Sequence, residues 1–175
     1  MRTGTRSCRI PLTRGRDARF SGRLAGVSNA SHDLLSIVYS SSAAHPYDAE
    51  DLGALLALSR ENNARHQLTG MLLYRNGRFL QVLEGPEDVL RRRMSIIAAD
   101  PEHTDVRILL QGTIDERQFP DWTMGYEPVS EAMEGDVPGY RTTFADLDRD
   151  EDPSDSLQAL RELIRWFQDR AIQLR

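Results

Sequence analysis

The Asn76-Gly77 pair constrains the fold of this chain more than any other feature, because runs of β-forming residues flank it on both sides. Asn-Gly favours a tight hairpin turn, since both residues tolerate the positive φ angles that such a turn needs. Residues 69–75 and 78–85 are therefore predicted to be antiparallel neighbours in a sheet.

The second strand of this hairpin, residues 78–85, is apolar on both faces. Side chains alternate along a strand, so Gln81 lies on the face of Phe79 and Leu83, while Leu80 and Val82 lie on the other face. We expect this strand in the centre of a sheet that is covered on both sides. Gln81 is then a buried amide, which would cost about 1–3 kcal/mol without hydrogen-bond partners. A polar partner beside Gln81 is therefore predicted.

The rest of the pattern predicts an α/β (α+β) fold. Asp48 is the expected N-cap of a first helix that ends near Asn62-Asn63, and Pro86 opens a second helix that ends at Asp100-Pro101. Strands are predicted over 34–39, 69–75, 78–85, 106–111 and 122–126, with a loop over 40–44. This order gives a ferredoxin-like βαββαββ sheet with both helices on one face.

The C-terminal part of the chain predicts a cover for the other face. Residues 127–156 hold ten acidic residues against two arginines and are expected to be irregular, with short helical turns over 130–133 and 142–145. Residues 154–174 predict an amphipathic helix, whose apolar positions are Leu157, Leu160, Ile164, Phe167, Ala171 and Leu174. This helix is expected to cover the face of Leu80 and Val82, and an interface with a subunit or a partner on the same helix is a compatible alternative.

Composition excludes several classes of partner. The net charge of −5 argues against general nucleic-acid binding, and no apolar run approaches the roughly 20 residues that cross a bilayer. We therefore expect neither nucleic acid nor membrane as a partner, and a cytoplasmic location. Cys8 is the single cysteine of the sequence, which excludes an internal disulfide and a cysteine metal site. No metal site is predicted.

Residues 1–32 differ in composition from the remainder. They hold seven arginines and one acidic residue, Asp17, so the other residues carry a net charge of about −11. This segment is predicted to be a disordered arginine-rich tail, whose composition resembles a transit peptide without an amphipathic stripe. A start codon placed too far upstream, or a basic arm for an acidic partner, are the alternatives.

Four polar residues are predicted at the layer between the sheet and its helices. Tyr39 ends the first strand, Gln81 lies on the central strand, and Asn62 and Asn63 end the first helix. Each alone has an ordinary structural explanation, such as an asparagine that ends a helix. Together they offer neutral donors and acceptors and no activated nucleophile, which suits recognition of a flat heteroaromatic ring with carbonyl and imide groups.

The sequence around these residues resembles the BLUF domain, a blue-light sensor that uses FAD. The resemblance covers about residues 33–127 and rests on residues 59–70, on Phe79-Leu80-Gln81-Val82-Leu83-Glu84-Gly85 and on Trp122-Thr123-Met124. It implies a non-covalent FAD site in residues 33–127, which the acidic linker and the amphipathic helix predicted from composition then follow over 128–175. It also implies a downstream signalling protein as partner, and a homo-oligomer.

The resemblance implies a role for each matching position. Tyr39 would donate an electron and a proton to the excited flavin, and Gln81 would lie between Tyr39 and the flavin and rearrange its amide on illumination. Ser59, Trp122 and Met124 would belong to the network around Gln81. The implied FAD contacts are Asn62 and Asn63 at the carbonyl edge, Leu55 and Ile97 on the two ring faces, and Arg65, Asp100 and His103 towards the ribityl and phosphate groups.

Other functions fit the sequence less well. Residues 76–81 also resemble the N-C-R-F-L-Q motif of LOV photosensors, but Gly77 occupies the position of the reactive cysteine, so adduct chemistry is excluded. A flavin redox enzyme would need a phosphate-binding loop or an acid/base pair, and the sequence shows neither. A ferredoxin-like interaction module without FAD is the third hypothesis. We expect no catalytic activity, because about 48 residues after 127 are too few for a cyclase or a phosphodiesterase domain.

Overall fold

The structure is a computed structural model that describes residues 33–130, 133–149 and 157–173. The predicted tail over 1–32, with Cys8, lies outside the described residues. So do residues 131–132 and 150–156 of the predicted acidic segment, and Leu174 of the predicted amphipathic stripe.

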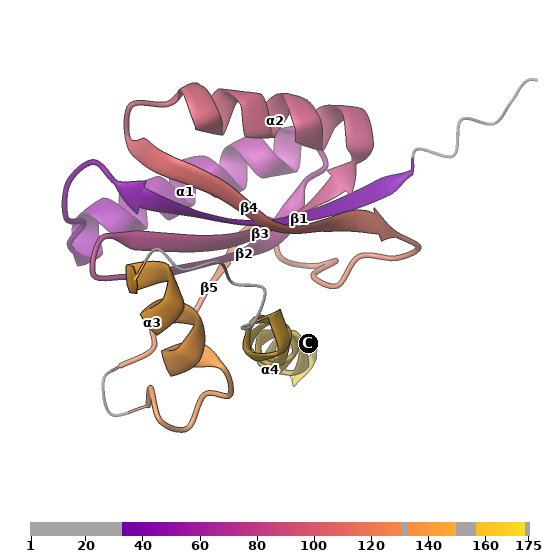
Figure 1. Cartoon of the computed structure of the whole chain (residues 1–175). Helices are drawn as coiled ribbons and strands as arrows, with labels where there is room; N and C mark the ends of the chain where they lie inside the picture. Colours follow the sequence, from indigo (N-terminus) through magenta and orange to yellow (C-terminus); the bar gives the residue numbers. More distant parts are fainter. Residues whose placement is uncertain (1–32, 131–132, 150–156, 174–175) are drawn as a thin grey trace, which may run out of the picture. The chain divides into compact units, whose positions relative to one another are not determined.

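The sheet has five strands in the order β4-β1-β3-β2-β5, and helices lie on both of its faces (Figure 1). The strands are β1 (Leu34–Ala43), β2 (Thr69–Arg75), β3 (Arg78–Pro86), β4 (His103–Ile114) and β5 (Gly125–Tyr126). The helices are α1 (Ala49–Arg65), α2 (Glu87–Ala99), α3 (Tyr140–Arg149) and α4 (Leu157–Gln173). Helices α1 and α2 share one face and α3 and α4 the other, which confirms the ferredoxin-like prediction.

The β2–β3 hairpin lies where the Asn-Gly pair predicts it. Asn76 has a φ of 49° and Gly77 a φ of 79°, so both turn residues take the left-handed conformation of a type I′ turn. Strand β3 pairs antiparallel with β2 on one side and with β1 on the other. It is therefore a central strand, as its two apolar faces predict.

The two predicted helix starts are close to those observed. Asp48 is the N-cap of α1, and its side chain accepts hydrogen bonds from the backbone N–H groups of Glu50 and Asp51 at 2.8 and 2.9 Å. Helix α2 begins at Glu87, one residue later than predicted, because Pro86 still belongs to β3 and stands at the N-cap. Both helices carry acidic residues in the first turn, which suits the positive end of a helix dipole.

A separate apolar core lies on each face of the sheet. The first core joins the sheet to α1 and α2 and includes Ile37, Leu52, Leu56, Leu83, Leu90 and Met94. The second joins it to α3 and α4 and includes Val38, Leu80, Val82, Phe144, Leu160 and Phe167. The C-terminal helix thus covers Leu80 and Val82, as its amphipathic pattern predicts.

Three elements are longer than the sequence predicts. Residues 40–43 were predicted as part of a loop but continue β1, since Ser40, Ser41 and Ser42 pair with β3 and their ladder contacts override the weak β propensity of serine. Strand β4 extends beyond the predicted 106–111 at both ends, because β1 pairs along its whole length. The predicted single turn over 142–145 is the ten-residue helix α3.

The fifth strand is shorter than predicted. It was expected over 122–126, yet only Gly125 and Tyr126 pair with β2, in parallel to Met71 and Leu72. The indole of Trp122 lies against Gly125, where an added Cβ would come within 1.8 Å of the ring. The chain therefore turns over residues 119–124 before it enters the sheet.

Replacing Gly70 by alanine should destabilise the domain by about 3 kcal/mol. A Cβ at Gly70 would lie 1.9 Å from the backbone oxygen of Val82, so β2 would have to move away from β3. Gly53 is the matched control, because a Cβ there meets nothing within 4 Å and alanine in a helix is favoured over glycine by about 0.5–1 kcal/mol. Urea unfolding of both variants measures the contrast. Equal stabilities of the two variants would contradict the close strand packing.

Candidate functional site

A cavity of about 160 Å³ lies between the sheet and the helices α1 and α2. Its floor comes from the sheet and its walls from the two helices. The lining residues are Tyr39, Leu55, Leu58, Ser59, Asn62, Asn63, Leu72, Phe79, Gln81, Leu83, Arg93, Ile96, Ile97, Asp100, His103 and Met124. Ten of the residues that the sequence predicted for the site line this one cavity, although β1, α1, β3, α2, the start of β4 and the β4–β5 connection supply them.

Gln81 lies between Tyr39 and Met124 at the floor of the cavity. Tyr39 is paired with Gln81 in the β1–β3 ladder, and its hydroxyl donates a hydrogen bond to Gln81 Oε1. Gln81 Nε2 donates to the sulfur of Met124 at 3.3 Å. The side chain is 7% exposed, so the buried amide that the sequence predicts does have a partner at each end.

Burial keeps the phenol of Tyr39 neutral. The side chain is 1% exposed, and this desolvation raises the pKa of Tyr39 well above its ordinary value, against a smaller opposite effect of the Arg93 charge. A neutral phenol has an O–H group to donate, which the bond to Gln81 uses.

Asn63 ties α1 to the segment that carries Met124. Its side chain is 1% exposed, and Nδ2 donates to the backbone oxygen of Thr123 at 2.6 Å. A primary amide has two N–H groups and one oxygen, so Asn63 retains hydrogen-bonding capacity towards the cavity. Arg60 adds a second tie, with Nε donating to the backbone oxygen of Met124 at 3.0 Å.

The mouth of the cavity is apolar and open to solvent. Leu58 on α1 and Ile96 on α2 are each 58% exposed, and both line the cavity. Large apolar side chains at a cavity mouth are typical of a site that an apolar ligand covers. An amide and a phenol at the floor, with apolar walls, fit a flat ring that carries polar groups on one edge.

His103 lies at the end of the cavity where β4 begins. Its Nδ1 is 2.8 Å from the hydroxyl of Ser41, and its ring packs on Phe79 with centroids 5.2 Å apart. Burial lowers the pKa of His103, while Asp100 and Glu102 raise it to a smaller extent. The imidazole is therefore neutral at neutral pH.

Two predicted site residues lie outside the cavity. Trp122 stacks on Phe119, with ring centroids 5.9 Å apart, and packs against the core shared by α3 and α4. Arg65 is exposed and pairs with Glu61 one helical turn earlier. Neither residue is among those that line the cavity.

The residues 115–124, here called the 115–124 loop, are held at the end of β3. Glu84 Oε2 accepts hydrogen bonds from the backbone N–H groups of Gln118 and Phe119, at 2.9 and 3.1 Å. Arg117 donates to the backbone oxygens of Glu84 and Gln67, at 2.9 and 2.6 Å. Residues 117–119 are therefore fixed to the end of β3, and the loop continues from there to Met124 in the cavity.

The buried carboxyl of Glu84 predicts a pH dependence of stability. Burial raises the pKa of Glu84, and the N–H groups of Phe119 and Gln118 oppose this in part. The folded state thus holds the proton more tightly than the unfolded state, so the contribution of Glu84 is largest at acid pH and is lost as the pH rises through the folded pKa.

Glu84→Gln removes this titration and keeps a side-chain oxygen for Gln118 and Phe119. We expect the wild-type protein to lose free energy of unfolding relative to this variant as the pH rises from about 4 to 7. Urea unfolding of both proteins across that range measures the difference. A difference that grows in favour of the wild type with rising pH would show that the carboxylate is the preferred form.

The sequence did not single out several residues that line the cavity. Arg93 is one of them, although a charged residue between Leu90, Met94 and Ile97 is a signal for a polar site. Leu58 and Ile96 carry no such signal, because their exposure depends on how far α1 and α2 lie apart.

Two further findings concern other classes of site. Among the residues that the structure describes, no group of three or more His, Cys, Asp or Glu side chains is placed to hold a metal ion. Within the same residues, no helix has the length and apolarity to cross a membrane.

Comparison with known proteins gives one family. The family model of sensors of blue-light using FAD, abbreviated BLUF, matches residues 34–125. A photoactivated adenylate cyclase subunit beta from Euglena longa is 41% identical over 106 residues, which are 58% of this chain and 12% of the relative. The chain thus spans a small part of that relative's length.

Solved structures agree with this match. The dark-state structure of BlrB, a BLUF protein, has a TM-score of 0.65 and 28% identity over 79% of this chain and 97% of the other. The photo-activated state of BlsA has a TM-score of 0.56 and 26% identity over 75% of this chain and 94% of the other. With its Tyr39–Gln81–Met124 site inside the matched residues, this chain belongs to the BLUF family of flavin-based blue-light sensors.

Proposed function

We propose that this chain is a blue-light receptor that binds FAD non-covalently and has no catalytic activity of its own. Light would act on the hydrogen bonds of Gln81, and the change would pass through the 115–124 loop and α4 to a separate signalling protein. The observation that carries the proposal is the position of Gln81 between the Tyr39 hydroxyl and the Met124 sulfur, at the floor of an open cavity.

The cavity residues fit a flavin. Leu55 and Ile97 would contact the two faces of the ring, and Asn62, Asn63 and Gln81 would meet its polar edge. Leu58 and Ile96 at the mouth are the apolar side chains that the bound ring would cover. Asp100, His103 and Arg93 lie where polar substituents of the cofactor would leave the cavity. When bound, the flavin supplies absorption of blue light and a site that accepts an electron from a neighbouring donor.

The hydrogen bonds of Gln81 can rearrange when its side-chain amide rotates. An amide that turns over exchanges its acceptor oxygen for its N–H donor, so Tyr39 would then face a donor instead of an acceptor. On the other side, the bond from Nε2 to the Met124 sulfur is weak, because a thioether is a poor acceptor. Leaving this bond costs Gln81 little, whereas the Tyr39 hydroxyl must find a new partner.

One amide is too weak a switch to act alone. A net hydrogen bond is worth about 0.5–1.5 kcal/mol, whereas moving an output from 1:99 to 99:1 needs about 5.5 kcal/mol. The lit state must therefore recruit further contacts, and the 115–124 loop offers them.

The 115–124 loop contacts both faces of the sheet. Met124 lies in the cavity, while Phe119 and Trp122 pack with α3 and α4 on the opposite face. The backbone oxygen of Trp122 also accepts a hydrogen bond from Gly70 N of β2 at 2.8 Å. A shift of Met124 would thus be transmitted through the loop to β2 and to α4.

Several contacts continue this route to α4. The side chains of Gln118 and Gln168 hydrogen-bond to each other. Arg170 forms an ion pair with Glu127, in which Arg170 Nε lies 2.8 Å from Glu127 Oε2. These contacts support α4 as the element that presents the signal. The relatives that carry an adenylate cyclase name are consistent with a downstream effector, which we propose is a separate protein here.

Loading with cofactor tests the proposal. The purified full-length protein, incubated with FAD and then passed over a desalting column, should be yellow, and the released cofactor should be FAD on chromatography. A colourless protein that cannot be loaded would overturn the proposal and favour an interaction module without light response. Retention of FMN with exclusion of FAD would correct the cofactor. Bleaching by NADPH with turnover would favour a flavin redox enzyme.

A further inference from the structure

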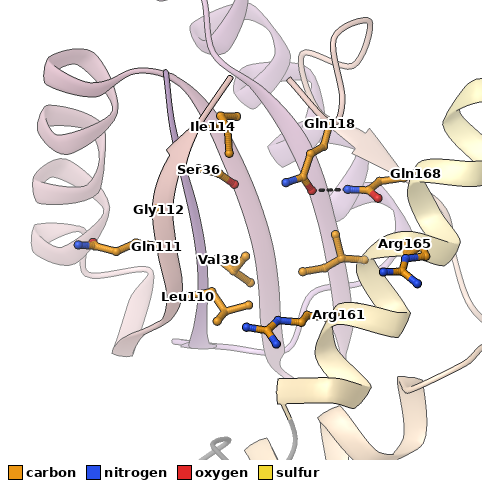
Figure 2. A pocket seen from close by; sticks show the side chains of 11 residues that line it. Ser36, Val38, Leu110, Gln111, Gly112, Ile114, Gln118, Arg161, Arg165 and Gln168 are labelled. Carbon is orange, nitrogen blue, oxygen red and sulfur yellow. Dashed lines mark hydrogen bonds between the residues drawn. The ribbon is translucent and has the colours of Figure 1, made fainter. Parts of the chain in front are cut away.

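An open groove of about 460 Å³ lies on the opposite face of the sheet from the cavity, between α4 and the strands β1 and β4 (Figure 2). Helices α3 and α4 pack over β2, β3 and Val38, while β4 is only partly covered: Leu110 and Ile114 are half-buried and Gly112 is exposed. The lining residues are Ser36, Val38, Leu110, Gln111, Gly112, Ile114, Gln118, Arg161, Ile164, Arg165 and Gln168.

The floor of the groove is apolar, and its α4 wall is basic. Val38, Leu110 and Ile114 form the floor together with Gly112, while Arg161 and Arg165 stand on the α4 side (Figure 2). The two arginines are exposed, and among the described residues no ion pair is recorded for either. None of the lining residues is acidic.

This basic wall contrasts with the remainder of the domain. Residues 33–175 carry a net charge of about −11, because the seven arginines and the single aspartate of residues 1–32 account for +6 of the total of −5. Two exposed arginines beside an apolar floor therefore favour a partner that brings both apolar and acidic side chains.

We propose that this groove binds an acidic amphipathic helix of a partner protein. Arg161 and Arg165 are four residues apart and so lie on one face of α4, one turn from each other. Acidic residues at the same spacing on an incoming helix would meet both, while its apolar stripe would cover Leu110 and Ile114.

The chain's own N-terminal segment is a poor occupant on grounds of charge. Its seven arginines would repel Arg161 and Arg165. Charge complementarity thus favours an acidic partner over this segment.

The groove shares a residue, Gln118, with the route that we propose for the light signal. Gln118 belongs to the 115–124 loop, and its hydrogen bond to Gln168 closes one end of the groove (Figure 2). Met124 belongs to the same loop and accepts the hydrogen bond of Gln81. Light dependence of binding therefore rests on the proposed function, whereas binding in the dark does not. One net hydrogen bond by itself would change the affinity at most about tenfold, so a larger difference between dark and lit affinity needs the further contacts of the 115–124 loop.

Binding of two synthetic peptides to the flavin-loaded full chain tests the proposal. Both are alanine-rich helices of about four turns with a leucine stripe, one with glutamates four residues apart beside the stripe and the other with lysines there. Fluorescence anisotropy in the dark should show binding of the glutamate peptide and little binding of the lysine peptide. Equal binding of both, or binding of neither, would overturn the proposal.

Charge reversal in the protein should invert this preference. Arg161→Glu combined with Arg165→Glu should weaken the glutamate peptide about tenfold and strengthen the lysine peptide. An unchanged flavin spectrum confirms that the variant folds. Unaltered affinity of both peptides would show that the arginines do not contribute.

Filling the groove is an independent test that leaves its charge unchanged. A Cβ at Gly112 meets nothing within 4 Å, so Gly112→Phe should occupy the groove without disturbing the fold and abolish peptide binding. Gly53 on α1 is equally open, and Gly53→Phe should bind the peptide as the wild type does. Peptide binding that survives in Gly112→Phe would place the peptide elsewhere.

Sedimentation of the full chain tests whether a second copy of the chain, and not an acidic partner, occupies the groove. A dimer that Gly112→Phe dissociates and Gly53→Phe leaves intact would mean that a second copy fills the groove, which overturns the acidic partner. Dark binding that depends on Gly112 but does not change with light would support the groove and count against the proposed route through Gln118.

Discussion

Gln81→Leu should bind flavin as the wild type does and lose the whole light-induced spectral shift. Leucine has nearly the volume of glutamine but neither donor nor acceptor, so the cavity keeps its shape. Both hydrogen bonds of the side chain, from Tyr39 and to Met124, are removed. The absorption spectrum before and after blue light, recorded on the loaded variant, measures the loss.

Gln158→Leu is the control for this substitution. Gln158 is exposed at the start of α4 and bonds only to Glu162 within the described residues, so its replacement should leave the shift intact. A normal shift in Gln81→Leu would refute the role of Gln81. Loss of flavin from Gln81→Leu would show that Gln81 holds the cofactor, and the spectral test would then use Gln81→Asn, which keeps the amide but shortens it.

Tyr39→Phe should likewise block the native light response while the fold is retained. The substitution removes one hydroxyl from a side chain that is 1% exposed and leaves the ring in the apolar core. Gln81 Oε1 then lacks the donor that it has in the wild type, at a cost of about 1–3 kcal/mol in stability. Spectra during illumination and urea unfolding report the two effects separately.

Tyr47→Phe is the matched control. Tyr47 packs on the same core, but its hydroxyl bonds to Glu102 at 3.2 Å and does not line the cavity. Its replacement should leave the light response intact. A complete photocycle in Tyr39→Phe would remove Tyr39 from the proposed mechanism and would point to another donor among the cavity residues.

The position of Gln81 could be predicted from the sequence, because it depends on a two-residue period and on one turn. Asn76-Gly77 sets the hairpin, and apolar neighbours on both faces place the strand in the centre of the sheet. The hydrogen-bond partner of Gln81 could not be predicted from the apolar strand pattern alone. The pairing of Tyr39 with Gln81 depends on the register between β1 and β3, which strands distant in sequence adopt only in the folded sheet.

Trp122 shows where strand periodicity fails. Trp122 and Met124 are two residues apart, so a continuous strand would place both side chains on one face. The strand begins only at Gly125, and the preceding turn sends Met124 into the cavity and Trp122 to the core of the opposite face. The two residues thus lie on opposite sides of the sheet although the sequence predicts them together.

Helix α3 shows the opposite case, a signal that was present and underestimated. Tyr140, Phe144 and Leu147 recur at helical spacing, and all three are buried against the sheet. Acidic residues and prolines around them favoured an irregular segment instead. Arg75 of β2 pairs with Glu134 at 3.0 Å, and this contact between the sheet and the segment before α3 is one that local pattern does not reveal.

The central claim is that this chain binds a flavin and switches reversibly under blue light through Tyr39 and Gln81. Absorption spectra of the FAD-loaded full-length protein, in the dark, after blue light and after recovery in the dark, test it most directly. The account predicts a flavin spectrum that shifts to longer wavelength in light and returns in darkness. A flavin spectrum that stays unchanged by light, or bleaches without recovery, would contradict it.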